Sequence, residues 1–243
     1  MTQKYKAKGV VLVTGGAKRI GRAICLSLAS TGYKVALHYH HSASEAEKTA
    51  KVIRQKRGVC NLFPCDLSDQ KQTVSLIDNV LRKFKGLDVL INNASIFEPS
   101  TIKNSPLESL NQHFSVNFNA PYILTSQFAK KIKKGQIINI LDTHIVRNKT
   151  QHTAYLLSKK ALSALTKLSA IELAPHFRVN GIAPGLIISP ANTKSGYLDR
   201  LAKKIPLKKK GDVGQIIQSI EFLLNNSYLT GQIIFNDGGE HLT

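Results

Sequence analysis

The chain has 243 residues, of which 42% are hydrophobic, and a formal net charge of +19. That length and composition are enough for one substantial core, so we expect a single domain over residues 1–243. No apolar run approaches the roughly 18 residues that span a bilayer, and the run at 10–13 is too short for a signal peptide, so we expect a cytoplasmic protein without a membrane partner.

The positive charge is open to more than one interpretation. Lysines are spread along the chain, with small clusters at 130–134 and 203–210, which is typical of a solvated surface. The same charge would attract anionic small molecules, whereas no aromatic and basic motif indicates a nucleic-acid partner. Cys25, Cys60 and Cys65 lack the paired spacing of a zinc site, which indicates structural thiols in a reducing compartment.

Short β-branched runs alternate with longer helical patterns along the whole chain. We expect strands at residues 10–13, 35–37, 59–63, 87–91, 136–141, 178–182 and 232–235. Between them we expect helices at residues 20–30, 44–57, 70–84, 107–131, 153–174 and 213–225. The strands lack strict alternation, as expected when both faces of a parallel sheet are buried. The pattern predicts a single-domain, Rossmann-type α/β fold with a doubly wound parallel sheet of about seven strands and helices on both faces.

Residues 184–210 interrupt this alternation. The segment is rich in Gly, Pro, Ser and Lys, and it is longer than a simple connection between a strand and a helix. Long segments of this kind are usually functional, so we predict a substrate-binding loop at residues 185–210.

A glycine-rich loop with the sequence TGGAKRIG occupies residues 14–21, between the first expected strand and the first helix. Glycines let the backbone turn tightly against a pyrophosphate, whose charge the helix N-terminus then stabilises. The position predicts a dinucleotide site, while a structural turn would be enough to explain Gly15 and Gly16 by themselves.

The end of the second expected strand predicts which dinucleotide binds. An NAD enzyme usually carries an acidic residue there, whereas the 2′-phosphate of NADP needs cations. This chain reads HYHHS at residues 38–42, and its next acidic residue is Glu45 in the following helix. Arg19 in the glycine loop is placed to reach the same phosphate. We therefore predict NADPH; the alternative is that the histidines and Arg19 only face solvent.

Two further loops complete the expected cofactor cleft. Asp66 and Leu67 follow the third strand and are expected beside the adenine. Asn92, Asn93 and Ala94 follow the fourth strand and are expected to line the floor of the cleft. The carboxyl ends of parallel strands meet at one edge of the sheet, so these loops belong to one site.

Tyr155 and Lys159 lie four residues apart on an expected helix, so they share one face. A cation near a phenol favours the phenolate and lowers the phenol pKa, and the pair can then donate or accept a proton beside a hydride carrier. By itself this spacing often arises by chance. With the glycine loop and Asn117 upstream in order, it indicates an oxidoreductase site.

These motifs resemble those of the short-chain dehydrogenase/reductases over essentially the whole chain. The resemblance includes Asn117 as the asparagine of the catalytic tetrad, Pro184 and Gly185 after the sixth strand, and DGG at residues 237–239. Within that superfamily the chain most resembles the pteridine and dihydromonapterin reductases. The discriminating features are Arg19 in place of the middle glycine of the loop, the segment 38–42, Ser95, Phe97, and Asp142 at the position of the tetrad serine.

The resemblance implies NADPH-dependent reduction of dihydropterins to tetrahydropterins, with dihydrofolate as a further candidate substrate. It implies that the catalytic residues are Asn117, Asp142, Tyr155 and Lys159. It implies that the cofactor contacts Gly15, Lys18, Arg19, Ile20, Gly21, His40, His41, Ser42, Asp66, Leu67, Asn93, Ala94, Ser95, Tyr155, Lys159, Pro184 and Gly185. It implies that the substrate contacts Ser95, Phe97, Asp142, Tyr155 and Leu186. It also implies a homotetramer built through residues 107–131 and 153–174.

Asp142 is the residue that indicates the substrate class. A serine at this position polarises a carbonyl oxygen, whereas a pterin presents ring nitrogens that must accept a proton as hydride arrives. Asp142 and Tyr155 together would relay that proton, and Phe97 would stack on the flat ring. The alternative is that Asp142 is a structural carboxylate and Thr143 serves as a displaced serine.

Two departures from the parasite pteridine reductases bear on binding. His41 stands where those enzymes carry an arginine, and Ile187 stands where they offer a hydroxyl. The histidines His113, His144 and His152 lack matching carboxylates and spacing for a metal site, so we expect no metal.

Two other functions stay open. A reductase of carbonyls such as 3-oxoacyl thioesters has the same design but normally needs serine or threonine at position 142. A nucleotide-sensing or nucleic-acid-binding protein that has lost catalysis would not need Asn117, Tyr155 and Lys159, which are all present.

Overall fold

A seven-stranded parallel sheet organises the computed structural model, which describes residues 8–189 and 196–243. The strand order is β3-β2-β1-β4-β5-β6-β7. The strands are β1 (Gly9–Val13), β2 (Tyr33–Tyr39), β3 (Cys60–Pro64), β4 (Val89–Asn92), β5 (Gly135–Ile140), β6 (Phe177–Pro184) and β7 (Ile233–Asn236). The chain runs outward from β1 to β3 and then returns to β4, so the strand order reverses between β1 and β4, where ligands of such sheets usually bind.

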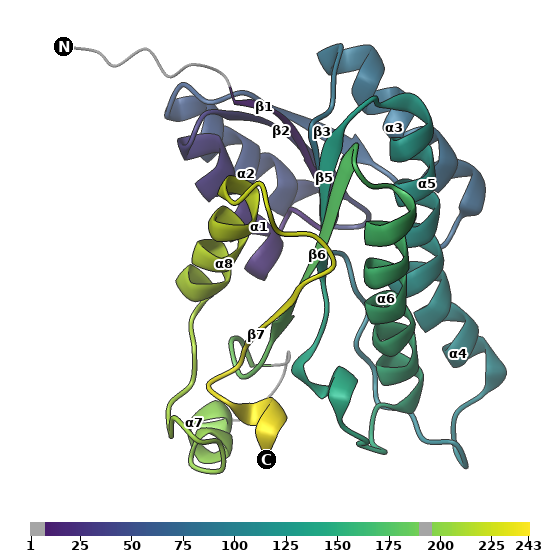
Figure 1. Cartoon of the computed structure of the whole chain (residues 1–243), viewed down its shortest axis with the longest axis vertical. Coiled ribbons are helices and arrows are strands. Elements are labelled where there is room, and N and C mark those ends of the chain that lie inside the picture. The colour runs from purple at the N-terminus through teal and green to yellow at the C-terminus, as the bar shows by residue number, and fades with distance from the viewer. Residues whose placement is uncertain (1–7, 190–195) are drawn as a thin grey trace.

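Helices cover both faces of the sheet (Figure 1). One face is covered by α1 (Arg19–Ser30), α2 (Ala43–Gln55) and α8 (Val213–Asn225); the other by α3 (Gln70–Phe84), α4 (Leu107–Phe114), α5 (Ala120–Lys131) and α6 (Thr153–Glu172). Alternate residues of β1 point to opposite faces: Val11 and Val13 belong to one hydrophobic cluster, Val10 and Leu12 to the other. Both faces are therefore buried, and the predicted doubly wound fold is confirmed.

Helix ends follow the local sequence where capping residues are present. The Asp69 carboxylate accepts hydrogen bonds from the backbone N–H groups of Lys71 (2.8 Å) and Gln72 (3.2 Å) and so begins α3. Asp212 and Gln215 form a reciprocal capping box at the start of α8. Both helices begin and end at the predicted residues.

The predicted helix at residues 107–131 is wrong in its middle, because a π-helical turn (Ser115–Asn119) separates α4 from α5. Pro121 has no backbone N–H, so the Asn117 carbonyl loses the partner that a regular α-helix would provide, and the helix widens there. The predicted loop at residues 185–210 contains a short helix, α7 (Tyr197–Ala202), and its residues 190–195 lie outside the described residues. Short 3-10 turns also form at Thr143–Val146 and Glu240–Leu242.

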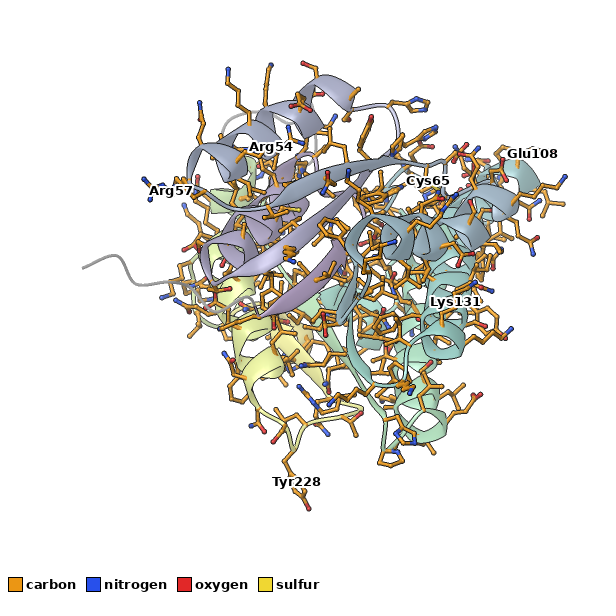
Figure 2. The ribbon with its side chains drawn as sticks, turned by 90° about the horizontal axis from the view of Figure 1, so that it is seen from above. Arg54, Arg57, Cys65, Glu108, Lys131 and Tyr228 are labelled. Carbon is orange, nitrogen blue, oxygen red and sulfur yellow. The ribbon has the colours of Figure 1, made fainter. Side chains whose placement is uncertain are left out.

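The positive charge is dispersed over the surface. Seen from above, Arg54 and Arg57 lie at the rim away from Lys131 (Figure 2). Arg54 pairs with Glu47 at 2.9 Å and Lys131 with Asp78 at 2.7 Å. No helix in the described ranges is long and apolar enough to cross a membrane.

The three cysteines are buried and carry free thiols. Burial raises the pKa of the Cys60 and Cys65 thiols to about 11, and it also raises the pKa of the Cys25 thiol well above its usual value. A thiol with so high a pKa is a poor nucleophile, which agrees with a structural role.

Candidate active site

A cavity of about 920 Å³ lies at the carboxyl ends of the central strands. Most of the predicted site residues line it: Gly15, Lys18, Arg19, Ile20, Gly21, His40, Asp66, Leu67, Asn93, Ala94, Ser95, Phe97, Asp142, Tyr155, Lys159, Pro184, Gly185 and Leu186. Three predicted residues, His41, Ser42 and Asn117, do not line it. The cavity has the size of a ligand site, and it lies beside the reversal in strand order.

The glycine loop at the N-terminus of α1 leaves room for a pyrophosphate. A Cβ atom on Gly21 would lie 2.1 Å from the Gly15 carbonyl oxygen, and one on Gly15 would lie 3.0 Å from Ala94 Cα. Gly15 also has a φ of +63°, which favours glycine. No side chain caps the start of α1 and its first turn holds no acidic residue, so its N–H groups are free to bind an anion.

His38 fastens this loop to the neighbouring strands. The Gly15 N–H donates to His38 Nδ1 (3.0 Å), and His38 Nε2 lies 3.0 Å from the Cys65 carbonyl oxygen, to which it donates. One ring nitrogen must accept and the other must donate, so the imidazole is neutral. Burial lowers the pKa of His38 to about 4, which agrees with that assignment. The residue is a structural link rather than a ligand for the 2′-phosphate.

The loop after β4 is fastened to the glycine loop in the same way. Thr14 Oγ1 accepts from the backbone N–H groups of Asn93 (2.9 Å) and Ala94 (3.0 Å). The Asn93 side chain donates to the carbonyl oxygens of Thr14 (2.8 Å) and Gly15 (3.2 Å). The two loops therefore form one rigid wall of the cavity.

The segment expected to hold the 2′-phosphate lies at the start of α2. His40 lines the cavity, and its ring is 3.5 Å, centroid to centroid, from that of His41. His40 Nε2 lies 3.7 Å from an Asp66 carboxylate oxygen. Ser42 precedes α2 without capping it, but Glu45 lies in the first turn of this helix, so its N-terminus is less favourable to an anion than that of α1.

Arg19 differs from its expected position. Its guanidinium donates to the carbonyl oxygens of Ser189 (2.8 Å) and Ile188 (3.5 Å), in the loop after β6. The structure therefore places the Arg19 side chain between the start of α1 and the loop after β6, and not against the histidine segment.

The proton-transfer residues meet at the inner end of the cavity. The Tyr155 hydroxyl donates to Asp142 Oδ2 (2.8 Å). Lys159 Nζ donates to the Ile140 carbonyl oxygen (2.7 Å) and lies 5.9 Å from the centroid of the Tyr155 ring. The tyrosine and lysine share one face of α6, as predicted, and Asp142 follows directly after β5.

The prediction that Lys159 lowers the Tyr155 pKa is wrong for this arrangement. Burial raises the pKa of Tyr155, and the Asp142 carboxylate at its hydroxyl raises it further. Burial also lowers the pKa of Lys159 to about 8. The closer negative charge outweighs the more distant cation, so Tyr155 is a neutral phenol that can donate a proton.

The environment of Asp142 keeps this carboxylate ionised. Burial alone would raise its pKa, but hydrogen bonds from His144 and attraction to the His144 ring lower the pKa below its usual value. The neighbouring Thr143 hydroxyl is buried and donates to the Asp237 carboxylate instead. The geometry thus favours Asp142 over Thr143 as the partner of Tyr155.

Asn117 lies behind the site. Its side chain accepts from the Ile96 N–H (2.9 Å) and donates to the Ile96 carbonyl oxygen (3.0 Å) and to Ser158 Oγ (3.1 Å). It is 1% exposed and contacts neither Tyr155 nor Lys159 through any hydrogen bond of the described residues. Asn117 therefore holds the loop that carries Ser95 and Phe97 against α6.

Phe97 stands at the cavity mouth and is 45% exposed. Its ring stacks on His152 (centroids 4.1 Å apart) and meets Tyr155 edge-on (4.7 Å). His152 thus covers one face of the Phe97 ring. The sequence had suggested His152 only as a rejected metal ligand.

Several cavity residues were not predicted from the sequence, among them Arg147, Lys149, Gln151 and Glu240. Others lie within the predicted loop at residues 185–210, although the sequence did not single them out, among them Tyr197, Leu198, Leu201 and Lys204. Glu240 lies on the C-terminal 3-10 turn, and its Oε1 is 3.1 Å from His144 Nε2, while His144 Nδ1 is 2.7 Å from Asp142 Oδ1. The spacing of Asp142 and His144 is visible in the sequence, but nothing local predicts the contact with Glu240. In the parts of the chain that the structure describes, no cluster of three or more His, Cys, Asp or Glu side chains is arranged to hold a metal ion.

A parallel sheet with this strand order, an open glycine loop and a buried Tyr–Lys pair at one cavity define an α/β oxidoreductase. The chain belongs to the short-chain dehydrogenase/reductase family: the model of the enoyl-(acyl carrier protein) reductase group of that family matches residues 15–241. The predicted resemblance is confirmed.

Three of the similar proteins represent two substrate classes. The alternative dihydrofolate reductase 1, FolM, of Brucella canis, solved in complex with NADP, superimposes with a TM-score of 0.94 at 32% identity, covering 100% of this chain and 97% of that one. Pteridine reductase 1 of Leishmania tarentolae is 30% identical over 96% of both chains. The 3-oxoacyl-[acyl-carrier-protein] reductase FabG of Staphylococcus epidermidis is 31% identical, over 95% of this chain and 98% of its own. Identity alone does not separate the two substrate classes.

Proposed function

We propose that the protein is an NADPH-dependent reductase of dihydropterins of the dihydromonapterin or dihydrobiopterin type, with dihydrofolate as a further substrate. The observation that carries the proposal is the 2.8 Å hydrogen bond between the Tyr155 hydroxyl and the Asp142 carboxylate inside the cavity. A ring nitrogen must gain a proton, and a phenol in contact with a carboxylate can supply and recover one. The names of the pteridine reductase and FolM relatives support the same substrate class.

The cavity residues fit a phosphorylated dinucleotide. The open N-terminus of α1, Gly15 and Gly21 would hold the pyrophosphate, and His40, His41 and Ser42 would face the 2′-phosphate, with Lys18 nearby. Asp66 and Leu67 would lie at the adenine, and Asn93, Ala94, Pro184 and Gly185 would line the nicotinamide half, with Lys159 at its ribose. When bound, NADPH supplies the hydride; the protein supplies the proton.

Tyr155 is the proton donor in this proposal. The neutral phenol gives its proton to the ring nitrogen beside the carbon that gains the hydride, and Lys159 offsets the resulting phenolate charge. The ionised Asp142 beside the phenolate is repulsive, which favours rapid return of a proton to Tyr155. Phe97, Ser95 and Leu186 would hold the flat substrate, and the described parts of residues 185–210 would cover it.

Reduction of 3-oxoacyl thioesters is the competing proposal, supported by the FabG relative. That chemistry calls for a hydroxyl that polarises a carbonyl oxygen. Position 142 offers a carboxylate, and the Thr143 hydroxyl is bonded to Asp237. A non-catalytic, nucleic-acid-binding role has the weakest support, because the dispersed cations are partly paired and the buried Tyr155–Lys159 pair serves no such role.

The deciding experiment measures NADPH oxidation with dihydromonapterin, dihydrobiopterin, dihydrofolate and an acetoacetyl thioester, and repeats the active pairs with NADH. We expect turnover of a dihydropterin and a clear preference for NADPH. Turnover of the thioester alone would refute the substrate class, and preference for NADH would refute the cofactor. Asp142→Ala should abolish pterin turnover, whereas Thr143→Ala should retain it.

The expected homotetramer and cytoplasmic location stay predictions. Large apolar side chains are exposed on the helices expected to form the interfaces: Leu107, Tyr122, Leu157, Leu168 and Ile171. Apolar surface of this kind often marks a contact between subunits. Sedimentation velocity of the purified protein tests the assembly.

A further inference from the structure

His144 connects the catalytic pair to the edge of the cavity. Its Nδ1 lies 2.7 Å from Asp142 Oδ1, and the other oxygen of Asp142 accepts from Tyr155. The chain of contacts thus runs from the Tyr155 hydroxyl through one carboxylate to the imidazole. His144 is the only described ring with a hydrogen bond to Asp142 besides that of Tyr155.

The far side of the imidazole meets a second carboxylate. Glu240 Oε1 lies 3.1 Å from His144 Nε2, although the two residues are 96 positions apart. Glu240 is 5% exposed, and its Oε2 has no hydrogen-bond partner within the described residues. Carboxylate oxygens accept hydrogen bonds, so the two carboxylates favour a ring that donates from both nitrogens and carries a positive charge, whereas the Lys149 ammonium against Nε2 favours a neutral ring.

Charged groups from every neighbouring element act on this ring. Asp142 and Glu240 favour its protonation, and Lys149 Nζ, which lies against Nε2, opposes it. Tyr155 and Lys159 face it only across Asp142. Although burial would lower the pKa of His144, hydrogen bonds to the two carboxylates raise it to about 9. Lys149 has a side chain that is 57% exposed, so solvent reaches this end of the chain of contacts.

We propose that His144 is the proton reservoir of the reaction: after Tyr155 has given its proton to the substrate, the His144 Nδ1 proton passes to Asp142 Oδ1, the carboxyl group turns so that this oxygen faces the phenolate, and the same proton passes to Tyr155. The inference rests on the proposed function, because it assumes that Tyr155 donates a proton during reduction. One proton leaves His144 for each proton that Tyr155 gives up, and the neutral ring regains a proton from water at the Lys149 edge before the next turnover. Glu240 is a positioning residue that holds the ring and favours its charged form.

A structural alternative fits part of the same geometry. The backbone N–H of His144 also donates to Asp142 Oδ1 (2.8 Å), so Asp142 begins the 3-10 turn, and the ring could serve only to orient the carboxylate. His144→Asn separates the two roles, because the asparagine amide can donate to Asp142 but holds no transferable proton. His144→Ala removes both contacts.

The test compares the steady-state kinetics of His144→Asn and His144→Ala with the wild type, on whichever substrate the wild type reduces. The proposal predicts that kcat falls on the order of tenfold in both variants, with little change in KM. Added imidazole should restore the alanine variant, and Glu240→Gln should move the basic limb of the kcat–pH profile to lower pH. His241→Asn is the matched control: this histidine lies beside Glu240, but its ring contacts Asp237, so its kcat should match the wild type.

A second readout needs no substrate. In an NMR titration of histidine-labelled protein, His144 should be charged at pH 7 and should lose its proton near pH 9, and Glu240→Gln should lower that midpoint. A neutral His144 at pH 7 overturns the proposal whichever substrate is found. If His144→Asn keeps the wild-type kcat and pH profile, the proton-reservoir proposal is overturned as well, and His144 only orients the Asp142 carboxylate. Failure to reduce any dihydropterin would instead refute the proposed function, without changing the titration.

Discussion

The two halves of the cavity are built in different ways. In the cofactor half, the Thr14 side chain bonds to the backbone of the adjacent loop, and Gly15, Gly21 and Thr14 lie in a single short motif. In the catalytic half, side chains from distant segments meet: Asp142 follows β5, Tyr155 lies on α6, and Glu240 lies on the last turn of the chain. In Figure 1 this last, yellow turn lies on the same side of the molecule as α7 and far along the chain from β5.

The contrast predicts how each half responds to substitution. Backbone geometry either accommodates a pyrophosphate or excludes it, so changes in the cofactor half should act on binding and stability. The catalytic half is a chain of proton donors and acceptors, so changes there should act on turnover. Three measurements, ordered by the size of the expected effect, can break or sharpen this division.

Tyr155→Phe should give the largest effect. Loss of the hydroxyl removes the proton donor but keeps the buried ring, so kcat should fall about 10²- to 10⁴-fold while NADPH still binds. Steady-state kinetics and a fluorescence titration with NADPH measure the two quantities. Tyr33→Phe, on β2 and outside the cavity lining, is the control. Comparable losses in kcat and in NADPH affinity would contradict the division.

Acid should weaken the cofactor half through His38. Its pKa in the folded protein is about 4, below the usual 6.5, so the unfolded chain binds the extra proton first as the pH falls. The contribution of neutral His38 to the free energy of unfolding is therefore fully present above about pH 6.5 and is lost as the pH falls toward 4. It amounts to at most about 3 kcal/mol. Urea unfolding at several pH values measures the free energy of unfolding. In His38→Gln the free energy of unfolding should depend less on pH between 6.5 and 4 than in the wild type. The same dependence in both proteins would refute the role of His38 in acid stability.

Gly21→Ala should give the smallest of the three effects. The added methyl group would lie 2.1 Å from the Gly15 carbonyl oxygen, so the loop must move and NADPH affinity should fall about tenfold, which corresponds to about 1.4 kcal/mol. Gly86→Ala is the matched control, because a Cβ atom there meets nothing within 4 Å. Saturating NADPH should restore most of the kcat of Gly21→Ala. Unchanged affinity would show that the loop tolerates a side chain.

The cofactor half was largely predictable from the sequence for a physical reason. A tight turn before a helix needs glycine at particular positions, so the motif at residues 14–21 specifies its own backbone geometry. The alternation of buried strands and amphipathic helices specified the parallel sheet in the same way. Even there the sequence could not show that the Arg19 guanidinium contacts a loop about 170 residues away.

The catalytic half was predictable only in part. The sequence indicated Asp142, Tyr155 and Lys159 as a group, because their spacing repeats a known pattern. It gave the wrong direction for the Tyr155 pKa, because that pKa is raised first by burial and then by the Asp142 carboxylate 2.8 Å from the hydroxyl. Neither of these can be read from the spacing of Tyr155 and Lys159. The catalytic role of Asn117 stays a prediction, and nothing in the sequence indicated that its side chain holds the Ile96 backbone.

By itself, then, the sequence determined the fold, the family and most of the residues that line the cavity, because periodicity and glycine placement act over short stretches of chain. Only the tertiary structure decided the protonation states of Tyr155 and His144 and the side chains that contact Asp142. The imidazole of His144 meets the carboxylate of Glu240 because β5 and the C-terminal turn end at the same edge of the sheet, and no local pattern encodes that meeting.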